Sequence, residues 1–166
     1  MLEKETQTIK RSSQMGLWGS VGVVIVAGLF QYASPWRFEG QTPYVNRWML
    51  IAGSVLAVLS VSMALLVIRK QVPRLRQSEK LEDKVTGYAS YIRSLFLSIF
   101  VVVVVLCLMM LLSGQNVLLM LAMVTVLMLF LAYPNIYKVK VDLGLTDEEM
   151  KNLYGDRYIA ESKNEE

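Results

Sequence analysis

Few side chains in this chain could do acid–base, nucleophilic or metal chemistry. The 166 residues include no histidine and a single cysteine, Cys107. One cysteine cannot close a disulfide within the chain, and without histidine it cannot complete a Cys/His metal site or an imidazole-based acid–base pair. Cys107 lies in a long apolar segment, where a lone cysteine is typical of a small packing residue. We therefore expect no metal site and no cofactor.

The acidic residues form no catalytic pattern either. Asp142, Asp147 and Asp156 are spread along a polar tail, whereas a lipid-head-group transferase would need aspartates clustered at the end of a membrane helix. The long apolar segments contain no ionisable residue, and such residues usually mark proton or ion transport inside a membrane. No glycine-rich phosphate loop occurs. The sequence predicts a protein without enzymatic activity, and a membrane enzyme that uses tail carboxylates is the remaining enzymatic alternative.

The apolar segments that surround these residues predict a membrane protein. No Asp, Glu, Lys, Arg or His occurs in the 44 residues between Arg93 and Lys138. A bilayer core about 30 Å thick needs about 20 apolar residues of helix, so this stretch holds two spans joined by the polar turn at 113–116. We predict an all-α, polytopic membrane protein with four transmembrane helices in an antiparallel bundle. The spans are expected near residues 15–33, 48–68, 94–112 and 117–133.

Small residues in the first two spans predict close helix packing. They are Gly16, Gly19 and Ser20 in the first span and Gly53, Ala57, Ser60 and Ala64 in the second. Small side chains let helix backbones approach each other in lipid. The first set is expected to pack on another helix of the same subunit, with a homodimer seam as the alternative. The last two spans carry larger residues, and we expect them to contact mainly lipid.

The distribution of basic residues predicts the orientation. Fifteen of the seventeen Lys and Arg residues lie in the N-terminal tail (1–14), the central loop (69–93) and the C-terminal tail (134–166). Because basic segments stay in the cytoplasm, both termini are expected there (N-in/C-in), and the membrane is expected to be the bacterial inner (cytoplasmic) membrane. Trp36, Phe38 and Tyr44 in the first external loop suit an interfacial aromatic belt.

The central loop and the C-terminal tail are the predicted docking elements. Six basic residues of the loop are expected to contact anionic lipid or a partner: Arg69, Lys70, Arg74, Arg76, Lys80 and Lys84. Pro73 is expected to end or kink the second helix. Beyond it we expect a short amphipathic helix or an extension of the third helix, with Gly87 as the weak point. In the tail, Thr146 and Glu149 match a capping box that begins a short helix over about residues 146–154.

These features favour a non-enzymatic integral membrane protein, which acts as an accessory subunit, assembly factor or scaffold through helix packing and cytoplasmic docking. Its expected partners are membrane lipids, including anionic head groups, and another membrane protein or a second copy of the chain; nucleic acid is not expected. The alternative is a small oligomeric channel or transporter for a neutral solute, with Gln31 and the serines between residues 54 and 62 along its path.

Overall fold

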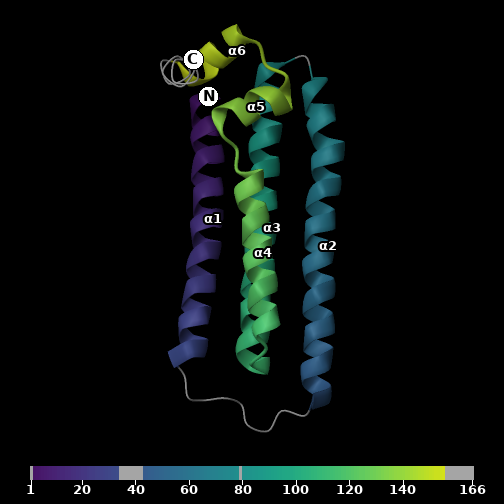
Figure 1. Cartoon of the computed structure of the whole chain (residues 1–166). Helices are drawn as coiled ribbons and strands as arrows, with labels where there is room; N and C mark the ends of the chain where they lie inside the picture. The colour runs from purple at the N-terminus through teal and green to yellow at the C-terminus, as the bar shows by residue number, and fades with distance from the viewer. Residues whose placement is uncertain (1, 34–42, 79, 156–166) are drawn as a thin grey trace. The chain divides into compact units, whose positions relative to one another are not determined.

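The computed structural model describes residues 2–33, 43–78 and 80–155, and over these residues the chain is all-α with no strand. In chain order the helices are α1 (Leu2–Ala33), α2 (Pro43–Arg76), α3 (Leu81–Ser113), α4 (Asn116–Ala132), α5 (Ile136–Leu143) and α6 (Asp147–Tyr154) (Figure 1). The all-α prediction is thus confirmed for this part of the chain. The predicted aromatic belt at Trp36 and Phe38 lies outside the described residues.

Several helices are long and apolar enough to cross a membrane, which indicates a membrane protein. Three candidates are the stretches Glu5–Ala33, Arg47–Arg76 and Leu81–Ser113. Helix α4 has only 17 residues, or about 25 Å at 1.5 Å per residue. Together with α5, from which it is bent by 74°, it forms a fourth candidate if the pair is one broken span. By length and composition the described chain therefore has three or four candidate spans.

The helices extend beyond the predicted spans. Helix α1 begins at Leu2 instead of near residue 15, and α2 continues through Pro73 to Arg76. Of the two predicted effects of Pro73, an end of the second helix is wrong, because α2 continues to Arg76; a kink stays a prediction. A proline three residues before a helix end removes only one hydrogen bond of the last turns, which the helix tolerates here.

Most of the predicted basic loop is also helical. Helix α3 begins at Leu81 and runs without a break past Gly87, so the extension of the third helix is the correct alternative. A Cβ atom at Gly87 would collide with the side chain of Leu75 on α2. Gly87 therefore serves as a place of close approach between two helices, and it is not a break within one.

The chain divides into two compact units, which we describe separately. The apolar unit comprises Gln14–Leu65 and Leu95–Ala132, and the charged unit comprises Met1–Ser13, Leu66–Ser94 and Tyr133–Glu166. Helices α1, α2 and α3 each contribute residues to both units. The units differ in composition, since one is apolar and the other is charged.

Helix α3 supplies much of the buried surface of the apolar unit. In the most apolar 18-residue stretch of α3, 39 % of the residues are buried, against 22 % in the corresponding stretch of α1 and 12 % in that of α2. Val103, Leu106 and Met110 on α3 are fully buried, as are Leu118 and Leu129 on α4. One face of each of these two helices is therefore buried within the chain, and the expectation that they contact mainly lipid stays a prediction. Burial is decided by which helix lies between the others, and large residues fill such a central position as well as they contact lipid.

The charged unit has a small apolar core of its own. Val85 on α3, Val139 and Leu143 on α5, and Met150 on α6 are at most 1 % exposed. Two short helices of eight residues each would be marginal alone, so their stability comes from burying these side chains. The described part of the chain after α4, residues 133–155, is accordingly a folded element.

Candidate functional site

The small residues of α1 pack against α3 within the same chain. A Cβ atom at Gly16 would lie 2.8 Å from Cβ of Phe96, and one at Gly19 would lie 3.2 Å from the ring of Phe100. Ser20 is fully buried, and its hydroxyl donates to the Gly16 carbonyl at 2.7 Å. This face therefore meets two phenylalanine rings of its own chain.

The small residues of α2 lie partly against α3 and α4. A Cβ atom at Gly53 would collide with Leu118 on α4 and lie 3.4 Å from a methyl group of Leu106 on α3. Ala57 is buried, 6 % exposed. Ser60 and Ala64, one and two turns further, are half-buried. The set thus follows a single line along the inner face of α2 that becomes more exposed toward Ala64.

Several hydroxyl groups in the apolar unit donate to carbonyl groups of their own helices. The Ser60 hydroxyl donates to the Ala57 carbonyl at 2.8 Å, and the Thr125 hydroxyl donates to the Leu121 carbonyl at 2.8 Å. Such bonds to a preceding carbonyl are the usual behaviour of Ser and Thr inside a helix. Cys107 is buried and unbonded to sulfur, in keeping with its predicted packing role.

A tyrosine–aspartate hydrogen bond joins α5 to α3 in the charged unit. The Tyr88 hydroxyl donates to Oδ2 of Asp142 at 2.9 Å, across 54 residues of sequence. Tyr91, one turn along α3, is also buried, with its ring centroid 6.0 Å from that of Tyr88. Its hydroxyl has no hydrogen-bond partner among the described residues. Sequence analysis did not find this cluster, because no local pattern links Tyr88 to Asp142.

Both short helices of the tail are capped by side chains. The predicted capping box is present: the Thr146 amide donates to Oε2 of Glu149 at 2.8 Å, and the Glu149 amide donates to the Thr146 hydroxyl at 3.3 Å. The first of these bonds is the main cause that lowers the pKa of Glu149. Helix α5, which the sequence analysis missed, is capped by Asn135, whose side chain accepts from the Lys138 amide at 2.6 Å. Gly144, in the left-handed conformation, ends this helix. The asparagine before the helix and the glycine after it are both common capping residues, and they could have predicted it.

The predicted basic contact residues lie in the charged unit, at the end of α2 and the start of α3. Five of them have exposed side chains, namely Arg69, Lys70, Arg74, Arg76 and Lys80, and Lys84 is half-buried. Arg76 lies against Gly144 in the turn between α5 and α6. Lys84 contributes, as a smaller effect, to the lowered pKa of Glu149. Two of the six basic residues therefore contact the tail helices or influence their charges.

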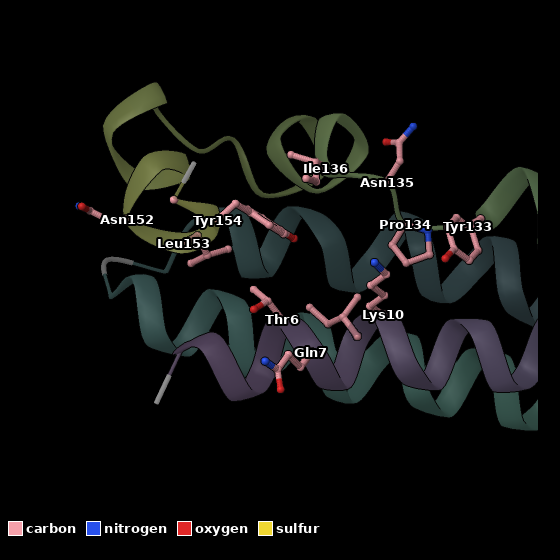
Figure 2. A pocket seen from close by; sticks show the side chains of 12 residues that line it. Thr6, Gln7, Lys10, Tyr133, Pro134, Asn135, Ile136, Asn152, Leu153 and Tyr154 are labelled. Carbon is pink, nitrogen blue, oxygen red and sulfur yellow. The ribbon is translucent and has the colours of Figure 1, made fainter. Parts of the chain in front are cut away.

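A pocket of about 530 Å³ lies within the charged unit. Its lining comes from three places: residues 6, 7, 9 and 10 of α1, residues 133–136 around the connection of α4 to α5, and residues 152–155 at the end of α6. Figure 2 shows the Lys10 side chain pointing from α1 toward Pro134, and the Tyr154 ring reaching from α6 toward α1. In the described ranges no three His, Cys, Asp or Glu side chains lie close enough together to hold a metal ion.

Comparison of the chain with models of known protein families, with curated proteins and with solved structures finds no match.

Proposed function

We propose that this protein is a four-span membrane protein of the bacterial inner membrane that acts by binding, as an accessory subunit, assembly factor or scaffold. In this proposal the four transmembrane helices form an antiparallel bundle with both termini in the cytoplasm, and α4 with α5 provides the fourth crossing and its exit. The basic residues then lie on the cytoplasmic side, in agreement with the rule for positive charges.

The observation that carries the proposal is the folded charged unit. An anchor needs only apolar helices, whereas this chain also builds α5 and α6 on a buried core that includes Val139, Leu143 and Met150. The Tyr88–Asp142 hydrogen bond and the capping box at Thr146 hold these helices in place. A folded unit that carries exposed Arg and Lys side chains suits the binding of an acidic partner surface.

A co-purification experiment tests the binding function. The tagged chain is cross-linked in membranes and extracted in mild detergent, beside a variant in which Arg69, Lys70 and Arg74 are replaced by Gln. A control variant replaces Arg11, Lys151 and Lys163 by Gln, which removes the same charge elsewhere. We expect one stoichiometric partner with the wild type and the control, and its loss with the first variant. A lone monomer in all three preparations would contradict the proposal.

The orientation has an independent test that uses the single cysteine. A Cys107→Ala chain has no other thiol, so a cysteine placed at Gln115 or at Glu148 can be labelled alone. With a membrane-impermeant maleimide on intact spheroplasts, we expect labelling at position 115 and none at position 148 until the membrane is opened. The reverse pattern would overturn the N-in/C-in topology without affecting the binding proposal.

A further inference from the structure

The pocket of the charged unit has the lining of a site for a singly charged anion. Lys10 is the one charged side chain among its lining residues, and no lining residue is acidic. Among the described residues Lys10 forms no ion pair. The other polar residues of the lining, such as Gln7 and Tyr133, are neutral. A lining whose charge is a single ammonium group suits a phosphate that carries one negative charge.

The other part of the lining is apolar, and this favours an amphiphile over a free anion. Pro134 and Ile136, which are half-buried, contribute hydrocarbon surface to the lining. The pocket volume of about 530 Å³ is ordinary for a small-molecule site and accommodates a head group with the first carbons of its chains. A fully soluble phosphate would leave this apolar surface uncovered.

The position of the pocket in the chain agrees with a lipid. Residues 133–136 close the charge-free stretch directly after α4, whereas Lys10 belongs to the charged start of α1. If α4 crosses the bilayer, on which this inference rests, Tyr133 lies at the level of the head groups, where tyrosine is common. We propose that the pocket binds the phosphate of an anionic phospholipid. A zwitterionic lipid is disfavoured, because no carboxylate of the lining would receive its ammonium group.

Lipid retention by the full-length protein tests this proposal. The chain is reconstituted in nanodiscs of equal phosphatidylglycerol and phosphatidylcholine, released into mild detergent, and its bound lipids are counted by native mass spectrometry. We expect selective retention of phosphatidylglycerol by the wild type and by Arg11→Gln, the charge-matched control on the same helix. Lys10→Gln should reduce this retention roughly tenfold, the effect of losing one charged hydrogen bond. Gln7→Glu, which adds a carboxylate to the lining, should reduce it at least as much.

Equal retention of the two lipids by the wild type would overturn the proposal, as would equal losses of phosphatidylglycerol in Lys10→Gln and Arg11→Gln. Displacement of the lipid by inorganic phosphate would also overturn it, because the pocket would then bind a soluble anion. Lys10 is exposed, so its replacement leaves the fold intact, and amide exchange in α1 verifies this. The outcome is separate from the co-purification test, which replaces no residue of the pocket lining, and a chain that does not cross the membrane would fail the cysteine labelling first.

Discussion

A methyl group added at Gly16 tests the packing of α1 on α3. The new Cβ would lie 2.8 Å from Cβ and 3.0 Å from a ring carbon of Phe96, whereas carbon atoms pack best at about 3.5–4.0 Å. Rotation of the phenylalanine ring cannot relieve the shorter contact, because Cβ is attached to the backbone of α3. The two helices must therefore move apart. Overpacking of this kind destabilises by about 1–3 kcal/mol, which raises the unfolding equilibrium constant roughly 5- to 150-fold.

Gly22→Ala is the matched control on the same helix. A Cβ atom at Gly22 meets nothing within 4 Å, and alanine favours a helix over glycine by up to about 1 kcal/mol. We expect Gly22→Ala to be neutral or stabilising and Gly16→Ala to be destabilising, measured as reversible unfolding of the purified chain in one detergent. Equal effects of the two substitutions, or a neutral Gly16→Ala, would refute the close packing of α1 on α3 at this point.

Three further predictions concern the charged unit, each measured as hydrogen exchange of the α5 and α6 amides. Tyr88→Phe removes the donor to Asp142 and should destabilise α5 by about 1.5–3 kcal/mol, whereas Tyr91→Phe removes an unpaired hydroxyl and should be neutral or stabilising; the opposite order would contradict the described bond. Thr146→Ala should weaken α6 by about 1 kcal/mol, and unchanged exchange would show that the capping box adds nothing. The pKa of Glu149 is lowered in the folded state. Its carboxylate therefore stabilises α6 above the unfolded pKa of about 4.3, and this stabilisation is lost as the pH falls through the folded pKa. Hydrogen exchange of the α6 amides in Glu149→Gln should lack this acid dependence.

Features that depend on neighbouring residues could be predicted from the sequence. The apolar segments follow from composition alone, and the end of α4 at Ala132 follows from the proline two residues later. The capping box at Thr146 is a four-residue pattern. Helix α5 belongs to the same class, since Asn135 and Gly144 are ordinary caps, and its omission was a failure to apply a local rule.

Other features needed contacts between distant residues. The continuation of α2 through Pro73, the role of Gly87 opposite Leu75, and the burial of α3 depend on which helices meet, and no short pattern encodes this. The Tyr88–Asp142 bond spans 54 residues, and the pocket combines α1, the connection after α4, and α6. The apolar segments and the positions of the charges could thus be predicted, because they are properties of single residues. The buried faces and the polar groups that meet could not, because burial and hydrogen bonding depend on residues that are distant in the sequence.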